Sequence, residues 1–115
     1  MVKGVPSQGD IIALESNAMH VLVLSREFFN RSGLAVVCPV NKDAHPDPLH
    51  IPLQTADYQG TAMLEHLKSI DLRARLYKTI ASVDFTTIQD ISDAVQGIFD
   101  YYPFSGWLTS EPNHF

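Results

Sequence analysis

The amino-acid sequence predicts a mainly β protein of the α+β class, a small barrel of short strands with one helix near the C-terminus. The first two-thirds of the chain alternate between short apolar stretches and clusters of Gly, Pro, Asn and Asp, which is the pattern of short strands joined by turns. From Asp84 onward the apolar residues recur at helical spacing instead. At 115 residues the chain is long enough for one core, so we expect a single domain over residues 1–115.

The predicted strands follow one another closely. Val21 to Leu24 is an unbroken aliphatic run, as in a strand buried on both faces. Ser25 is expected to cap one helical turn over residues 26–30, which ends before Gly33. Pro39 donates no ladder hydrogen bond, so we expect it near the end of its strand or at a sheet edge. The expected strands cover residues 10–15, 21–24, 34–40, 49–53 (an edge strand), 61–67 and 68–72, and the expected loops cover residues 41–48 and 54–60.

The C-terminal helix is predicted over residues 84–102, with Asp84 as its N-cap and Pro103 as its stop. Its apolar stripe is typical of core packing rather than of a cofactor surface, and contains Ile88, Ile91, Ala94, Val95, Ile98 and Phe99. The tail over residues 103–115 has no period. The aromatic residues around it favour a cover for the barrel or a dimer seam over base stacking, and are Tyr101, Tyr102, Phe104 and Trp107.

Composition limits the function classes. The net charge of -5 argues against a general nucleic-acid binder, because phosphate neutralisation needs clustered Lys and Arg. The single cysteine, Cys38, lies in an apolar run and is expected to be a buried, inert thiol in a reducing compartment. No stretch reads as a signal peptide or approaches the ~20 apolar residues of a membrane span, so a cytoplasmic location without membrane contact is expected.

Four stretches in the same order resemble the MazF/PemK/Kid (ChpB-like) toxin family of type II toxin–antitoxin systems. Residues 8–12 (QGDII) are similar to the family's R-G-D-hydrophobic start, and residues 20–25 (HVLVLS) to its R-P-hydrophobic-S stretch. Residues 29–40 follow in register, and residues 64–75 (LEHLKSIDLRAR) resemble the family pattern L-[ED]-Q-[VIP]-[RK]-[ST]-[IM]-D, with His66 in place of its Gln and Leu67 in place of its Val, Ile or Pro. The resemblance covers about residues 5–102 and rests mainly on the last of these stretches.

The resemblance implies an SH3-like β-barrel of the CcdB/PemK toxin type over residues 8–80, followed by the helix. It also implies a homodimer and a ribosome-independent endoribonuclease (an mRNA interferase) that inhibits growth by cleaving single-stranded RNA with no metal or cofactor. A cognate antitoxin would lie across the dimer groove, and operator DNA would be bound through the toxin–antitoxin complex.

The sequence departs from the family in the loop between the first two strands. The family carries G-x-E-Q-x-G-x-R-P there, whereas this chain has only Ser16 to Met19. Met19 stands at the Arg position and His20 at the Pro position, and the acidic residue of the loop is absent. Asn41 stands where the family has Thr or Ser. The four residues Ser-Asn-Ala-Met also match the remnant of a common affinity-tag cleavage, so a native short turn and a shortened longer loop both stay open.

These departures leave a revised set of candidate site residues. Cleavage by the 2′-hydroxyl needs a base, an acid and a cation, and Met19 can be none of them. His20 and His66 are candidate replacements as acid or base, provided that their strands are neighbours, and Glu65 would orient a base or contact RNA. The structural alternative is that both histidines are ordinary sheet residues and that Glu65 pairs with Lys68 or Arg75. The candidate RNA-binding residues are Asn41, Lys42, Lys68, Arg73 and Arg75, with Lys78 in the same basic cluster; the alternative for this cluster is a solvated face.

The sequence gives less support to other functions. His45 and His50, flanked by Asp43 and Asp47, are too irregularly spaced for a metal-site pattern, so no metal site is expected. A gyrase poison on the related CcdB barrel is disfavoured, because those toxins depend on a C-terminal Trp-Gly-Ile and this chain ends in Asn113-His114-Phe115. A catalytically impaired member that only dimerises and binds antitoxin or nucleic acid remains the main alternative to an active toxin.

Overall fold

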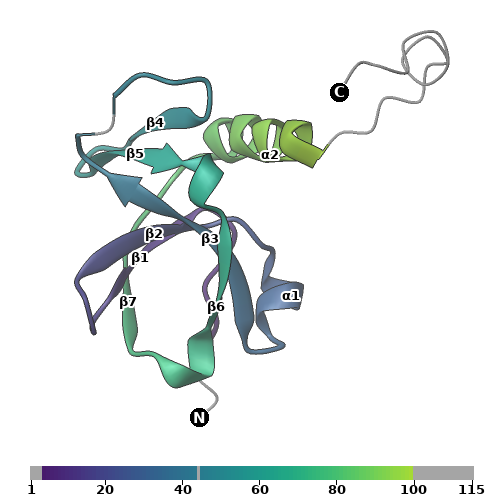
Figure 1. Cartoon of the computed structure of the whole chain (residues 1–115). Coiled ribbons are helices and arrows are strands. Elements are labelled where there is room, and N and C mark those ends of the chain that lie inside the picture. The colour runs from purple at the N-terminus through teal and green to yellow at the C-terminus, as the bar shows by residue number, and fades with distance from the viewer. Residues whose placement is uncertain (1–3, 44, 100–115) are drawn as a thin grey trace, which may run out of the picture.

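The computed structural model describes residues 4–43 and 45–99 (Figure 1). Within these residues the chain forms a curled antiparallel sheet followed by one long helix, as the sequence predicts. The elements are β1 (Asp10–Leu14), β2 (Met19–Val23), α1 (Glu27–Asn30), β3 (Leu34–Asn41), β4 (His50–Gln54), β5 (Gln59–Met63), the 3-10 turn η1 (Leu64–His66), β6 (Lys68–Asp71), the 3-10 turn η2 (Leu72–Ala74), β7 (Tyr77–Ser82) and α2 (Phe85–Phe99).

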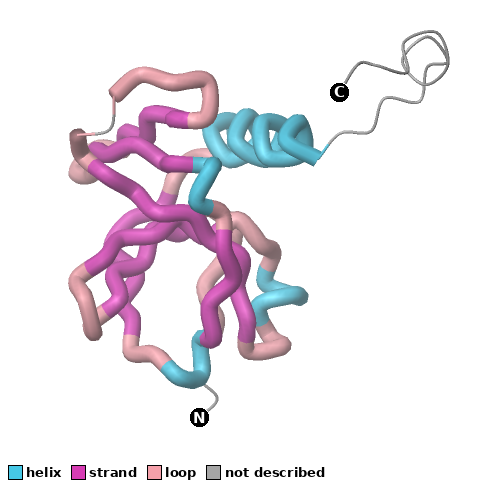
Figure 2. The backbone as a smooth tube through the Cα atoms, viewed as in Figure 1, coloured by secondary structure: helices cyan, strands magenta, loops and turns pink. Residues whose placement is uncertain are grey.

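The sheet has the order β4-β5-β3-β2-β1-β7, and β6 also pairs with β3. The strands curl around one another as a half-barrel (Figure 2), and α2 lies beside the β4–β5 hairpin (Figure 1). β4 is an edge strand, as expected, since its hydrogen-bonded neighbour in the sheet is β5.

Strand β3 changes its partner along its length. On one side it pairs with β2. On the other side it pairs with β6 from Leu34 to Val37 and then with β5 from Val40. Pro39 lies between these two registers, where that side of the ladder requires no donor, and this explains how a proline is accommodated inside the sheet close to its strand's end.

Alternation along the strands builds two apolar clusters, one on each face of the sheet. Ile11, Leu22 and Cys38 face α2 and pack with Leu53, Ala62, Leu64, Ile88 and Ile91. Ile12, Val21 and Val37 face the other way and pack with Leu14, Val23, Ala35, Ile70 and Leu72. Because both faces of β2 are covered, Val21, Leu22 and Val23 are all fully buried, which confirms the expectation for that run.

Helix α2 begins as predicted: the Asp84 carboxylate accepts a hydrogen bond of 2.8 Å from the Thr87 backbone N–H. Hydrogen bonding from Thr87 lowers the pKa of Asp84, first through the Thr87 side chain and second through its backbone amide. The helix is described to Phe99, so residues 100–102, Pro103 and the aromatic tail lie outside the described residues.

Three details of the predicted elements were wrong. Ser25 does not cap α1: its hydroxyl donates to Asn30 Oδ1 over 2.5 Å and accepts from the Val36 N–H. Residues 61–67 are not one strand, because the chain leaves β5 at Met63 and turns through η1. The expected loop over residues 54–60 is shorter, since Gln54 closes β4 and Gln59 already opens β5.

Asn30 ties α1 to the rest of the fold from a fully buried position. Its amide nitrogen donates to the Pro6 carbonyl (2.8 Å) and the Ser25 carbonyl (3.1 Å), while its oxygen accepts from the Ser25 hydroxyl. One side chain thereby satisfies two buried backbone carbonyls, which fixes the short helix against the N-terminal segment.

Candidate functional site

The turn between β1 and β2 is short, as the sequence predicts. Leu14 and Met19 face each other across the hairpin, and residues 15–18 close it. The Asn17 side chain accepts a hydrogen bond of 3.1 Å from the Met19 N–H, and Ala18 adopts a left-handed φ of 56°. The sequence as it stands therefore forms a complete tight turn at the place where the resemblance implies a long loop.

Met19 places its sulfur next to a cation. The Lys68 ammonium lies 3.8 Å from the Met19 Sδ. Lys68 opens β6 opposite Val37, and Met19 packs against the apolar cluster that contains Val37, so both side chains lie on the same face of the sheet. A positive charge thus stands beside the residue that occupies the family's Arg position.

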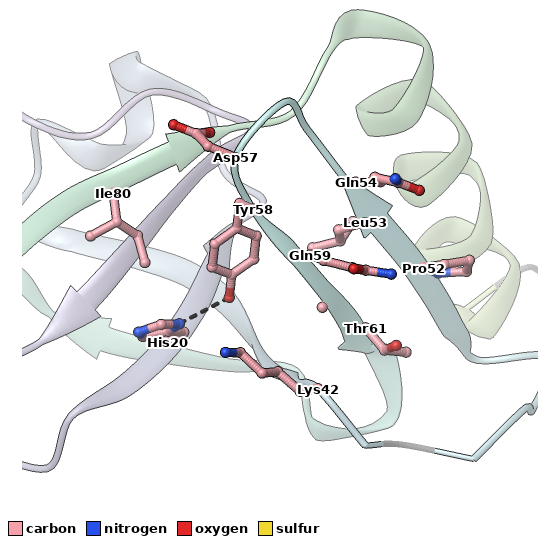
Figure 3. A pocket seen from close by; sticks show the side chains of 11 residues that line it. His20, Lys42, Pro52, Leu53, Gln54, Asp57, Tyr58, Gln59, Thr61 and Ile80 are labelled. Carbon is pink, nitrogen blue, oxygen red and sulfur yellow. Dashed lines mark hydrogen bonds between the residues drawn. The ribbon is translucent and has the colours of Figure 1, made fainter.

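His20, the next residue, points to the opposite face because side chains alternate along β2. Its Nδ1 lies 2.9 Å from the Tyr58 hydroxyl, and the two ring centroids are 5.7 Å apart. The side-chain ends of His20, Tyr58 and Lys42 converge on an open pocket of about 650 Å³ (Figure 3). Burial raises the pKa of Tyr58, so its hydroxyl stays protonated at neutral pH.

The partner of Glu65 is neither Lys68 nor Arg75 but His50. Glu65 Oε2 lies 2.7 Å from His50 Nε2, and the other ring nitrogen of His50 lies 2.6 Å from the His45 carbonyl oxygen. Both ring nitrogens face acceptors, so the ring satisfies both only as a doubly protonated imidazolium. The pKa of His50 is raised accordingly, first by the His45 carbonyl and then by Glu65, and the hydrogen bond from His50 lowers the pKa of Glu65.

His66 follows Glu65 in η1 and is largely open to solvent, with its side chain 55% exposed. Its Nε2 lies 3.8 Å from the same Glu65 oxygen that His50 contacts. η1 and β6 carry Glu65, His66 and Lys68 in one stretch of chain, in which Glu65 contacts His66, while Lys68 contacts Met19 at the start of β2. His20 contacts Tyr58 instead, and His66 lies in a turn rather than in a strand.

The other candidate RNA-binding residues are spread over the surface. Asn41 uses its side-chain oxygen to accept the Asp43 N–H over 2.8 Å. Arg73 pairs with Asp71 over 3.2 Å and covers Gly33, where an added Cβ would lie 2.6 Å from Arg73 Nε. Arg75 lines a separate shallow pocket of about 480 Å³ with Glu15 and Ser16.

No group of three or more His, Cys, Asp or Glu side chains within residues 4–43 and 45–99 is arranged to hold a metal ion. His45 and His50 contact each other instead, with their ring centroids 5.2 Å apart. Cys38 is fully buried, and burial, with a smaller effect from Glu65, raises its pKa to about 12, which makes an inert thiol.

Two residues of these constellations were missed by sequence reasoning. Tyr58 was correctly assigned to a loop, but its contact with His20 was not predicted. His50 was considered only as a metal ligand. Its pairing with Glu65 is a contact over 15 residues of sequence that no local pattern carries.

Comparison with known proteins identifies the family of this chain. The pattern of PemK-like, MazF-like toxins of type II toxin–antitoxin systems matches residues 8–99. Among curated proteins, no sequence matches the chain significantly. No helix in the described part of the chain is long and apolar enough to span a membrane.

Solved structures share the fold. The MazE–MazF complex of Deinococcus radiodurans superposes with a TM-score of 0.77 at 24% identity, over 84% of this chain and 98% of that one. A second crystal form of that complex gives 0.74 at 26% identity, over 83% and 96%. A mycobacterial endoribonuclease gives 0.74 at 14% identity, over 90% and 100%. With the curled sheet, the C-terminal helix and a family pattern that spans most of its length, this chain belongs to the PemK-like, MazF-like toxins of type II toxin–antitoxin systems.

Proposed function

We propose that this toxin is an endoribonuclease that cleaves single-stranded RNA without a metal ion, with Lys68, His66 and Glu65 as its cleavage centre. The observation that carries the proposal is the Lys68 ammonium 3.8 Å from Met19 Sδ. Where the family's motif has Arg, this chain has an apolar residue with a cation from β6 beside it. Lys68 can therefore supply the positive charge that a phosphorane requires.

The chemistry assigned to this centre is attack of the RNA 2′-oxygen on the adjacent phosphorus. His66, whose exposed side chain is accessible to RNA, takes the 2′-hydroxyl proton as the general base. The bond from phosphorus to the 5′-oxygen then breaks, solvent protonates the leaving oxygen, and a 2′,3′-cyclic phosphate and a 5′-hydroxyl result. Glu65, fixed by His50, orients His66, and Lys68 stabilises the phosphorane.

The assembly we propose is a homodimer that a cognate antitoxin neutralises, with operator DNA bound only through the toxin–antitoxin complex. The fold is shared with toxins solved together with their antitoxins, among them the mycobacterial endoribonuclease with its cognate antitoxin (16% identity, TM-score 0.72). Light scattering of the purified protein, alone and with an antitoxin peptide, measures both associations.

The experiment is incubation of the protein with a long single-stranded RNA in EDTA, followed by mapping of the new 5′ ends. We expect discrete cuts, a loss of about 10²-fold in rate for Lys68→Ala, and a comparable loss for His66→Ala. Arg31→Ala is the charge-matched control, since Arg31 pairs with Glu27 on α1. Cutting that needs a metal ion, or that persists unchanged in both variants, would contradict the proposal.

A second candidate is a catalytically impaired toxin that keeps its fold and its antitoxin contact. The observation in its favour is the tight turn over residues 15–18, which lacks the family's arginine and its loop carboxylate. Native protein that binds the antitoxin peptide but leaves RNA intact in EDTA would establish this candidate in place of the first.

A further inference from the structure

We propose that the pocket formed by His20, Lys42 and Tyr58 is a subsite for one unstacked nucleobase of a single-stranded RNA. This inference rests on RNA as the ligand of the proposed function, but not on cleavage. The pocket lies on the face of β2 opposite to Met19 and Lys68.

The lining suits a base better than a phosphate. Leu53, Pro52 and Ile80 give the pocket apolar walls, and the Gln54 and Gln59 amides, which face each other across the β4–β5 hairpin, can both donate and accept hydrogen bonds. Within that lining Lys42 is balanced by the Asp57 carboxylate. A net neutral cavity of about 650 Å³ with both apolar and polar walls has the size and character of a small-molecule site rather than of an anion site.

Tyr58 is held as a stacking platform. On one side its ring packs over Gly60, where an added Cβ would lie 3.3 Å from Tyr58 Cε2 and 2.6 Å from Val40 Cγ1. At its end the hydroxyl is hydrogen-bonded to His20 (Figure 3). A ring fixed in this way loses little entropy when a base stacks on it, and stacking is tolerant of base identity.

The overall charge favours such a subsite. A chain with a net charge of -5 gains less from counterion release than basic RNA-binding proteins do. Base stacking contributes affinity that does not depend on net charge. The His20–Tyr58 pair is an aromatic contact of this kind, and it lines the pocket of about 650 Å³.

A second cavity lies next to this pocket, as binding of an RNA strand requires. A second, smaller cavity of about 270 Å³, lined by His45, Asp47 and His50, shares Pro52 and Thr61 with the first. The two cavities therefore adjoin each other along the β4–β5 hairpin, and together they are called the groove here. Two adjoining cavities favour a nucleotide within a chain over a free mononucleotide.

The test uses a labelled RNA pentamer with 2′-O-methyl sugars, which cannot be cleaved by a 2′-hydroxyl, and measures binding by fluorescence anisotropy. We expect Tyr58→Leu to weaken binding by about tenfold or more, and Tyr58→Phe to weaken it less, because the ring remains. Lys42→Ala should weaken binding and reduce the salt slope by about 0.7, whereas Lys42→Arg should not. Arg31→Ala is the matched control outside the groove.

Two further measurements distinguish a nucleobase from other ligands. A 2-aminopurine placed in the pentamer should be quenched on binding, and a pentamer with an abasic site at the bound position should bind more weakly. Equal binding of the abasic pentamer, or unchanged binding by Tyr58→Leu with a native thermal transition, would overturn the inference. Mononucleotides that compete as well as the pentamer would also overturn it, because the subsite would then not serve a strand.

The outcome is independent of catalysis. Failure of the native protein to cut 2′-hydroxyl RNA would contradict the proposed cleavage and leave the anisotropy results unaffected. Conversely, normal cutting with no effect of Tyr58→Leu or Lys42→Ala on binding would contradict the subsite but not the proposed cleavage centre.

Discussion

His50 and Glu65 form a hydrogen-bonded ion pair of 2.7 Å in which the His50 ring is almost fully enclosed, its side chain only 4% exposed. The other nitrogen of the same ring contacts the His45 carbonyl, so one imidazolium joins β4, η1 and the preceding loop. This arrangement requires both partners to be charged, which makes its contribution to stability depend on pH.

We predict that this contribution is largest between about pH 4.5 and 6.5, the usual pKa values of the two groups. The raised pKa of His50 gives stability that is present below 6.5 and is lost as pH rises through the folded-state pKa. The lowered pKa of Glu65 gives stability that is present above 4.5 and is lost as pH falls through its folded-state value. Urea unfolding of the native protein and of His50→Gln should show a larger stability gap at pH 5.5 than at pH 8.5.

His45→Gln is the control for this experiment, because its backbone carbonyl and therefore the contact to His50 remain. The difference in the free energy of unfolding between His45→Gln and the native protein should be the same at both pH values. A gap for His50→Gln that does not change with pH would show that the ring is neutral in the folded protein.

We predict that Asn30→Ala destabilises the protein by about 2–4 kcal/mol, because two buried carbonyls and the Ser25 hydroxyl lose their partner together. The free energy of unfolding from urea titration measures the loss. Asn17→Ala removes an amide with a single exposed contact and should cost less than about 1 kcal/mol. Similar losses for the two variants would contradict the anchoring role of Asn30.

We predict that Ala18→Gly stabilises the fold by about 1 kcal/mol, since Ala18 has a φ of 56° and only glycine adopts that conformation without strain. The same substitution at Ala56, an exposed loop residue outside the left-handed region, should destabilise by about 0.4–1 kcal/mol through the unfolded state. Thermal unfolding of both variants checks the opposite signs, and equal signs would be inconsistent with strain in the turn.

We predict that Met19→Arg accelerates RNA cleavage by about tenfold or more, because a guanidinium there adds a second donor for the phosphorane next to Lys68. Single-turnover cleavage in EDTA measures the rate. Leu76→Arg adds the same charge at a residue that is 68% exposed and should leave the rate unchanged. A rate for Met19→Arg at or below the native value would argue against a phosphate position beside Lys68.

The sequence predicted more of the fold than of the candidate site. Alternation, turn residues and the helical period of residues 88–99 depend on local physics, and they located the core strands and α2. β7 was not predicted: Tyr77 to Ser82 is half-buried or exposed and has no apolar run, and it becomes a strand through its pairing with β1. Tertiary pairing outweighs local preference there.

The site depended on contacts that sequence spacing does not encode. The stretch around Glu65, His66 and Lys68 was found because it is contiguous. The contact between Lys68 and Met19 spans 49 residues, and that between His20 and Tyr58 spans 38. The curl of the sheet decides which of these side chains meet, since both contacts join residues in or next to strands that β3 separates.

Strand β3 also connects the two sites mechanically. Val37 holds Lys68 in register, and Val40, three residues further on, holds Ala62 of the hairpin that lines the groove. The stretch between them contains Pro39 and belongs to neither register. We expect a ligand that shifts the hairpin to act on the same strand that positions the ammonium of Lys68, so that the two faces of the sheet communicate through a single stretch of backbone.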